Sequence, residues 1–252
     1  MNNILSEKEY QRYIIDQLVK PECGYVEAPA AEFDRLFAMN RKALFDFLEA
    51  TQPEKMEALR KIYKGTMEDT LVAFINQQET RMNGSRLDVL KHGVELANIH
   101  LDLMYTKPAT TFNQELTALY HKNIFTVSEE VWASDSERVD LVIFLNGLAI
   151  ITLELKCNAA GQSYQDAIYQ YRMERSPKDR LFLWKAGALV NFAMDLEQVY
   201  MCTRLSGSST FFLPFNMGCG EGIQVGAGNP ILKDNYSVHY MWDDILQKDI
   251  LL

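Results

Sequence analysis

Three ionisable residues border two long apolar runs near the middle of the chain. Asp140 precedes the apolar run 141–145, while Glu154 and Lys156 follow the apolar run 148–153. Ionisable groups beside a buried sheet cost desolvation free energy unless other charges compensate them, so this placement favours a functional role. Two carboxylates and a lysine on one face would suit the metal-assisted hydrolysis of phosphodiester bonds.

The chemistry assigns a role to each group. We expect Asp140 and Glu154 to bind Mg²⁺, with Mn²⁺ as a substitute, together with the backbone carbonyl of Leu155 and several waters. The metal would polarise the phosphate and lower the pKa of a bound water. Lys156 would orient that water or neutralise charge that develops on the phosphate. The alternative is a solvated aspartate at a strand start and a Glu–Lys pair at a strand end, without chemistry.

A hairpin should connect the two apolar runs. Asn146-Gly147 between them is a strong short-range signal for a β-hairpin. Nearly every position of both runs is apolar, which indicates strands buried on both faces and helices on either side of the sheet. Glu154 and Lys156 are two residues apart in one strand, so their side chains share a face.

The register of this hairpin decides whether Asp140 joins that face. A plain two-residue turn with regular pairing throughout would turn Asp140 away from Glu154. A three-residue connection, with Gly147 in a left-handed bulge, would place Asp140 opposite Thr152 and on the same face as Glu154. The catalytic interpretation therefore predicts a bulge in the hairpin, and regular pairing would contradict it.

The next predicted helix, over 164–174, carries aromatic and basic residues. Gln165, Tyr169 and Arg172 fall on one face, and Tyr164, Ile168 and Tyr171 form the adjacent, more apolar face. Between 172 and 185 the cations outnumber the acids; they are Arg172, Arg175, Lys178, Arg180 and Lys185. A basic stripe beside a carboxylate site is where a DNA backbone would lie. A solvated helix face is the alternative interpretation.

The remaining sequence supplies the elements that must position these residues. Ser6 and Glu9 form a capping box, which predicts a helix over 6–20. The pattern from about 32 to 105 is helical and predicts an insert before the sheet. From about 106 to 252 the chain alternates between strand-like runs and helices. Strands are expected at 124–127, 141–145, 148–155, 188–192, 199–205 and 211–215, with a further short helix at 242–247. We expect an α/β fold in a single domain, with a mixed central sheet flanked by helices.

Composition excludes several classes of protein. The 252 residues are 48% hydrophobic, and no apolar run is long enough to span a membrane. The N-terminus lacks the features of a signal peptide, so we expect a cytoplasmic protein without a membrane partner. A net charge of −9 disfavours a protein that coats nucleic acid nonspecifically, but it leaves room for a local basic contact.

Other cofactor sites are not indicated. The four cysteines form no CxxC pair and the four histidines have no ligand spacing, which disfavours a zinc site. Glycines cluster between 218 and 228, but they form neither phosphate-binding nor dinucleotide-binding motif. We therefore do not expect this chain to bind ATP.

The segment RVDLVIFLNGL from Arg138, followed by LELK ending at Lys156, resembles the N-terminal nuclease domain of type I restriction endonuclease R subunits. That domain belongs to the PD-(D/E)xK nucleases. The likeness continues through 166–172, 175–177, 199–204 and 212–216, and upstream at 51–53 and 107–108. Residue 139 is Val where the superfamily name has Pro, and Cys157 stands where relatives usually have Asn.

The resemblance implies that Asp140 and Glu154 are metal ligands and that Lys156 is the catalytic lysine. The family also carries a glutamine–tyrosine motif in the following helix, which is thought to support cleavage and DNA contact. Gln165-x-x-x-Tyr169 matches its form, and Gln170-Tyr171 is a competing alignment. An acidic residue of the first helix, Glu7 or Glu9, could also reach the metal, although Glu9 fits the capping box.

In such enzymes this domain precedes an ATP-driven translocase, and the R subunit joins modification and specificity subunits that read DNA sequence. We expect a fragment of a longer chain, whose missing motor would bind ATP. We also expect weak cleavage of double-stranded DNA, indifferent to sequence. Two alternatives stay open, a catalytically silent docking module of the same complex and a stand-alone nuclease of the superfamily.

Overall fold

The computed structural model describes residues 4–110, 112–219 and 227–252. Its centre is a sheet with the order β1-β6-β7-β8-β9-β10-β11, joined at β8 by β3 and through it β2. The strands are β1 (Val26–Glu27), β2 (Phe33–Asp34), β3 (Met39–Asn40), β6 (Phe125–Trp132), β7 (Arg138–Leu145), β8 (Leu148–Leu155), β9 (Val190–Met194), β10 (Val199–Cys202) and β11 (Leu213–Pro214). The pairs β1–β6 and β8–β9 are parallel and the other pairs are antiparallel, so the predicted mixed α/β sheet is confirmed.

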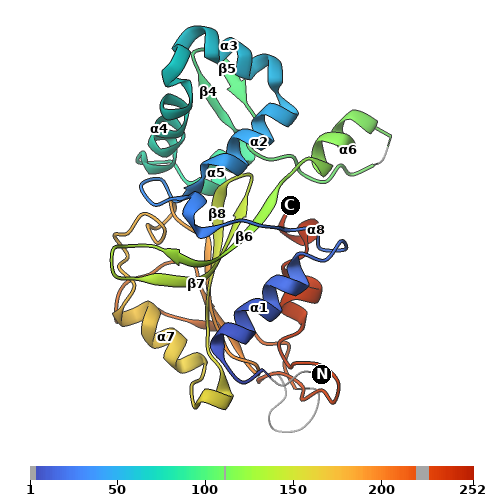
Figure 1. Ribbon diagram of the computed structural model, residues 1–252, viewed down its shortest axis with the longest axis vertical. Coiled ribbons are helices and arrows are strands. Elements are labelled where there is room, and N and C mark those ends of the chain that lie inside the picture. The colour runs from blue at the N-terminus through green and yellow to red at the C-terminus, as the bar shows by residue number, and fades with distance from the viewer. Residues whose placement is uncertain (1–3, 111, 220–226) are drawn as a thin grey trace.

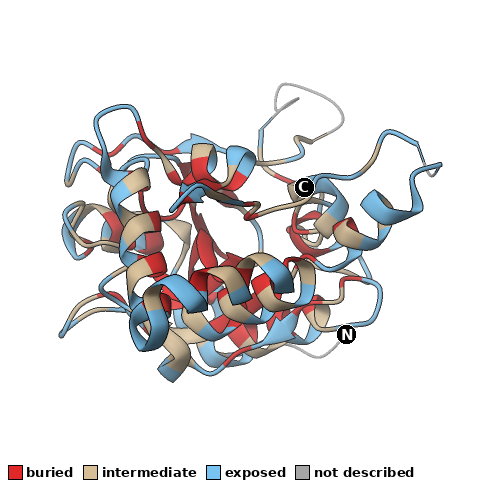
Figure 2. Cartoon of the chain, turned by 90° about the horizontal axis from the view of Figure 1, so that it is seen from above, coloured by how far each residue is buried: buried red, intermediate tan, exposed pale blue. Residues whose placement is uncertain are grey.

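Helices cover both faces of this sheet (Figure 1). Helix α1 (Glu7–Leu18) packs Ile14 against the face that carries Leu141 of β7, in the larger hydrophobic cluster. Helix α7 (Tyr164–Met173) packs Tyr171 against the face that carries Val142, in a second cluster. The strands between them are buried at nearly every position, as Figure 2 shows, because neighbouring residues of β7 point to opposite, covered faces.

Local sequence signals fix the starts of both helices. The Ser6 side chain accepts a hydrogen bond from the Glu9 backbone, and the Glu9 carboxylate accepts one in return, so the predicted capping box is confirmed. Helix α7 begins in the same way, with Ser163 and Asp166 as the reciprocal pair. Such caps satisfy backbone N–H groups that have no partner within the helix.

The predicted insert lies at one end of the sheet (Figure 1). It contains α2 (Arg41–Thr51), α3 (Pro53–Tyr63), α4 (Met67–Thr80) and α5 (Arg86–His92), with a short 3₁₀ segment at Lys64–Thr66, and another 3₁₀ segment, at Ala30–Glu32, leads into it. A helical pattern throughout is wrong for β2 and β3, which join the central sheet, and for β4 (Val94–Leu96) and β5 (Ile99–Leu101), which form a hairpin. Ala97 and Asn98 between them have φ of 53° and 60°, a turn geometry that the helical interpretation missed.

A buried ionic network joins the insert to the sheet. The fully buried Arg86 of α5 pairs with Glu79 of α4 at 2.8 Å. Its Nη1 also donates to the backbone carbonyls of Ala38 and Ala149, each at 3.0 Å. Arg180, from the loop after α7, pairs with the same glutamate. The insert is therefore attached to the core through polar contacts as well as apolar ones.

The C-terminal part differs in detail from the prediction. Strands β10 and β11 are shorter than the expected 199–205 and 211–215, and the expected helix at 242–247 is a π-helix, η4 (Met241–Ile245), followed by α8 (Lys248–Leu251). Helix α6 (Gln114–His121) and a 3₁₀ turn at Asn158–Ala160 had no predicted counterpart. Of the glycine-rich loop 218–228, residues 220–226 lie outside the described residues. None of the helices that the structure describes combines the length and the hydropathy of a membrane span.

Candidate active site

The β7–β8 hairpin contains the predicted bulge, at a different position. Asn146 and Gly147 form a two-residue turn with φ of 48° and 81°. Positive φ at both positions matches the twist of the flanking strands. The bulge lies inside β8, which contributes the extra residue Ile150 between its pairs with Ile143 and Phe144. The predicted three-residue connection at Gly147 is therefore wrong.

The bulge brings the two predicted carboxylates together. Beyond it, Leu141 pairs with Leu153, and extending this register by one residue puts Asp140 across from Glu154. The expected position of Asp140 opposite Thr152 is wrong by two residues, but the predicted shared face holds. An extra residue anywhere in the hairpin reverses the parity of the pairs beyond it.

Asp140 is nearly buried and held by one backbone donor. It is 8% exposed, and the N–H of Leu155 donates to its Oδ2 at 2.7 Å. Burial raises the pKa of Asp140 to about 6, against the lowering effects of that hydrogen bond and of Lys156. The Leu155 backbone thus fixes this carboxylate, while metal binding by the Leu155 carbonyl stays a prediction.

Glu154 is fully buried and half satisfied. Its Oε1 accepts a hydrogen bond from Nε of Arg175 at 2.7 Å, whereas its Oε2 has no partner among the described residues. Burial, followed by the charge of Asp140, raises the pKa of Glu154 to about 8, and Arg175 opposes the shift. A buried oxygen without a donor is costly. Next to a second carboxylate, it suits a divalent cation that would supply the missing positive charge.

Lys156 lies at the end of the same strand and faces the first helix. Its side chain is 4% exposed, and Nζ pairs with Oε1 of Glu7 at 2.9 Å. Of the two acidic residues expected near the site, Glu7 therefore reaches it. Glu9 instead accepts hydrogen bonds from the backbone of Leu5 and Ser6.

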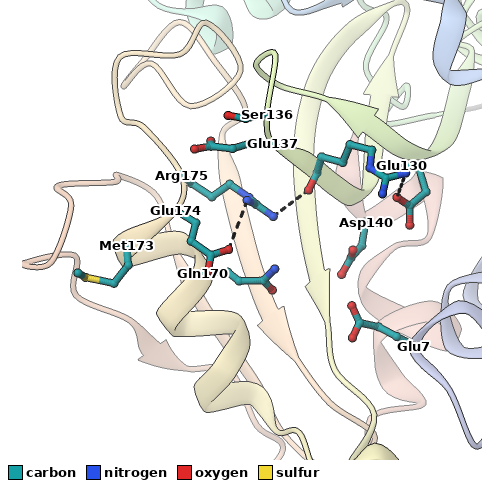
Figure 3. Close-up of a pocket in the computed structure, with 10 residues that line it drawn as sticks. Glu7, Glu130, Ser136, Glu137, Asp140, Gln170, Met173, Glu174 and Arg175 are labelled. Atoms are coloured by element: carbon teal, nitrogen blue, oxygen red, sulfur yellow. Dashed lines mark hydrogen bonds and ion pairs between the residues drawn. The ribbon is translucent and has the colours of Figure 1, made fainter.

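An acidic cavity of about 620 Å³ opens onto Asp140 (Figure 3). Its lining is Glu7, Glu130, Ser136, Glu137, Arg138, Asp140, Gln170, Met173, Glu174 and Arg175. Carboxylates outnumber cations in this set, and Glu7 and Asp140 point toward one another. Glu154 and Lys156 are buried next to this lining. A cavity of this charge attracts cations and repels phosphates unless a cation is present.

Helix α7 presents Gln170 to the cavity. Its Oε1 is buried without a hydrogen-bond partner among the described residues. Gln165 and Tyr169, the other alignment of the glutamine–tyrosine motif, are exposed and do not line the cavity. Tyr171 is fully buried, and its hydroxyl lies 2.8 Å from Oγ1 of Thr152, so it supports the sheet and is not accessible to DNA.

The predicted basic stripe is only partly on the surface. Arg175 is buried as the counter-ion of Glu154 and donates from Nη2 to the carbonyl of Arg138 at 2.8 Å. Arg172 donates to the carbonyl of Thr210 at 3.0 Å, and Arg180 belongs to the network around Glu79. Lys178 and Lys185 remain exposed. The structure thus gives Arg175 a place in the site that differs from the expected contact with DNA.

Glu130 and Arg138 are among the lining residues that were not predicted as part of the site. Glu130 of β6 has φ of 53°, a conformation that is unfavourable for a residue other than glycine. Its Oε2 pairs with Nη1 of Arg138 at 3.1 Å. Arg138 lies within the family-like segment, which was the available signal. Glu130 had none, because its place opposite Asp140 follows from the pairing of β6 with β7.

Within the described residues, no group of three or more His, Cys, Asp or Glu side chains is arranged to hold a metal ion. The predicted metal site therefore depends on two carboxylates, a backbone carbonyl and waters. In a comparison with protein families, residues 4–210 match the family described as type I restriction enzyme R protein N terminus. No curated protein matches the chain significantly.

Proposed function

Because the chain belongs to the family of type I restriction enzyme R protein N termini, we propose that it is the endonuclease domain of an R subunit. Its substrate is double-stranded DNA, and the reaction is metal-dependent hydrolysis of phosphodiester bonds. The observation that carries this proposal is the unpaired, buried Oε2 of Glu154 across the hairpin from Asp140. Both carboxylates lie beside an acidic cavity, and the PD-(D/E)xK lysine position is filled by Lys156.

The residues present fit a divalent cation. Asp140 and Glu154 would hold Mg²⁺, or Mn²⁺ in its place, with the Leu155 carbonyl and waters as further ligands. When bound, such an ion polarises the scissile phosphate and lowers the pKa of a coordinated water. Arg175 keeps Oε1 of Glu154 occupied at 2.7 Å, which leaves Oε2 for the cation. The Leu155 N–H likewise donates to Oδ2 of Asp140 and so holds that carboxylate in place beside Glu154.

Lys156 and Gln170 would act on the phosphate and the water. The Lys156 ammonium group, now 2.9 Å from Glu7, can neutralise charge that develops on the phosphate. The side-chain amide of Gln170 lines the cavity with a free oxygen, which can accept a hydrogen bond from the attacking water and so orient it.

The rest of the reaction belongs to partners. We propose that modification and specificity subunits choose the DNA site and that an ATP-driven translocase, elsewhere in the R subunit, moves the DNA. An R subunit with these partners would act in the cytoplasm. The domain itself would then cut without sequence preference, because its site holds general phosphodiester chemistry and its described cavity offers few neutral donors for bases.

The direct test is the nicking of supercoiled plasmid in Mg²⁺ and in Mn²⁺. Asp140→Asn, Glu154→Gln and Lys156→Ala should each lower the rate at least about 100-fold, because each removes a group that stabilises the transition state. Asp135→Asn is the control, since Asp135 is an exposed carboxylate that pairs with Arg35 outside the cavity lining. Equal rates in the wild type and the site variants would refute the assignment. A folded wild-type chain that neither binds metal at Asp140 and Glu154 nor nicks the plasmid would favour the docking module.

A further inference from the structure

Arg138 is the exposed cation at the rim of the cavity. Its side chain is 52% exposed, whereas that of Arg175, the other arginine in the lining, is 4% exposed. Lys156 is also buried and pairs with Glu7. Of the described residues that line the cavity, Arg138 is therefore the one that can offer a positive charge to a molecule approaching from solvent.

Two residues of β6 hold the Arg138 guanidinium group at the rim. Oε2 of Glu130 lies 3.1 Å from its Nη1, and the guanidinium carbon lies 5.1 Å from the centroid of the Trp132 ring. Trp132 is the cross-strand partner of Arg138, and its side chain is itself partly exposed. The ring limits the directions in which the planar guanidinium can point. The ion pair with Glu130 occupies one edge of the group.

This ion pair does little for folding. The side chains of Arg138 and Glu130 are 52% and 41% exposed, and pairs so open to solvent contribute little to stability. Glu130 nevertheless keeps a left-handed backbone with φ of 53°, although its neighbours Glu129 and Val131 pair regularly with β7. The Glu130 carboxylate thus lies beside Arg138 at the mouth of the cavity. A phosphate group could replace this carboxylate as the partner of the arginine.

We propose that Arg138 binds the phosphodiester backbone of DNA at this rim and exchanges Glu130 for a phosphate when DNA arrives. A guanidinium group forms two parallel hydrogen bonds with a phosphate, which a carboxylate-rich cavity otherwise repels. Asp140 lies two residues along the same strand on the same face, so this contact positions the DNA backbone beside the predicted metal ligands. The inference rests on the proposed function, which it extends by naming a positioning residue.

The test measures binding and needs no catalysis. Fluorescence anisotropy with a labelled duplex, in EDTA and over a range of NaCl, gives the Kd and the slope of log Kd against log salt. Arg138→Gln should weaken binding about tenfold and reduce the salt slope by about one, because one phosphate contact is lost. Arg138→Lys keeps the charge but not the planar fork, so its Kd should be intermediate with a slope near that of the wild type.

Glu130→Gln separates restraint of Arg138 from simple repulsion of DNA. If Glu130 competes with phosphate for Arg138, its neutralisation should tighten binding in the wild type and have no effect when Arg138→Gln is also present. An equal gain in both backgrounds would mean that Glu130 acts on the DNA directly, and the exchange would be wrong. Arg60→Gln is the matched control, an exposed arginine of α3 that pairs with Glu49.

Each remaining outcome is decisive. Equal Kd and equal salt slope for Arg138→Gln and Arg60→Gln, in a chain that binds and nicks DNA, would overturn the inference and leave the proposed function intact. A wild-type chain that neither binds duplex nor nicks plasmid would overturn both. Thermal melting of each variant checks the fold. The melting temperature should change little, because the side chains of Arg60 and Arg138 are exposed.

Discussion

Glu154 combines full burial with an unpaired oxygen, and this combination links proton binding, metal binding and stability. Its pKa in the folded chain is about 8, against 4.5 for an ordinary glutamate, chiefly because burial disfavours the charged form. Between about pH 4.5 and about pH 8, Glu154 thus keeps its proton in the folded state but has lost it in the unfolded state. A cation at the site would replace that proton, so metal affinity should rise with pH.

The resulting pH dependence has a definite sign. Stability from protonated Glu154 should be fully present below about pH 4.5 and be lost as pH rises through about 8. Glu154→Gln lacks this titration. The melting temperature of the wild type relative to that variant should therefore fall between pH 5 and pH 8 in EDTA, as followed by circular dichroism. A difference that stays constant with pH would contradict the assigned shift.

At the scale of single residues, part of the candidate site could be predicted from the sequence. Asp140, Glu154 and Lys156 were predicted because ionisable residues that border buried strands are unusual. Arg175 was expected on the surface, and its role as the counter-ion of Glu154 could not be predicted. Its position depends on how α7 and the following loop pack on the sheet, which no residue spacing specifies.

At the scale of elements, the turn between β7 and β8 fixes the pairing of Leu145 with Leu148, and the bulge at Ile150 then sets the position of Asp140. A Cβ atom at Gly147 would lie 2.4 Å from the Asn40 carbonyl oxygen, and φ there is 81°. Gly161 has a similar φ of 78° but nothing within 4 Å of such an atom. Substitutions at these two glycines therefore distinguish the free-energy cost of the backbone conformation from the cost of a steric clash.

Alanine at these two glycines should give unequal losses of stability. Gly161→Ala should cost about 1 kcal/mol in free energy of unfolding, the penalty of a left-handed conformation. Gly147→Ala should cost at least about 2 kcal/mol more, because the turn must also move away from Asn40. Urea denaturation measures both values. Losses of the same size would mean that the contact of this turn with Asn40 is loose.

Other elements were predictable to different degrees. The alternation of strand and helix patterns predicted the sheet, and the capping box of Ser6 predicted α1. A shared face for Asp140 and Glu154 requires a bulge in the hairpin; this bulge was expected at Gly147 and lies at Ile150. Pattern alone cannot locate a bulge inside a strand that is apolar at nearly every position, because each register buries equivalent side chains. The hairpin β4–β5 was missed for a related reason, since its short apolar runs also fit a helix.

At the scale of the whole molecule, the network around Glu79 attaches the insert to the sheet. Arg86 and Glu79 are both fully buried as side chains. Arg86→Met should lower the free energy of unfolding by about 3–5 kcal/mol, because it leaves Glu79 buried with only Arg180 as a partner. The double variant Glu79→Gln with Arg86→Met should recover part of this loss. Chemical denaturation tests both, and a loss below about 1 kcal/mol for Arg86→Met would contradict a structural role.

Asp140 and Glu154 are proposed to hold a divalent cation together, and calorimetric titration of Mn²⁺ at pH 8 tests this most directly. At this pH Asp140, with a pKa of about 6, is ionised, and Glu154, with a pKa of about 8, is ionised in about half of the molecules before metal is added. The wild type and the Asp135→Asn control should bind Mn²⁺, and the double variant Asp140→Asn, Glu154→Gln should lose that binding while keeping its fold. Identical titrations for the wild type and the double variant would contradict the claim.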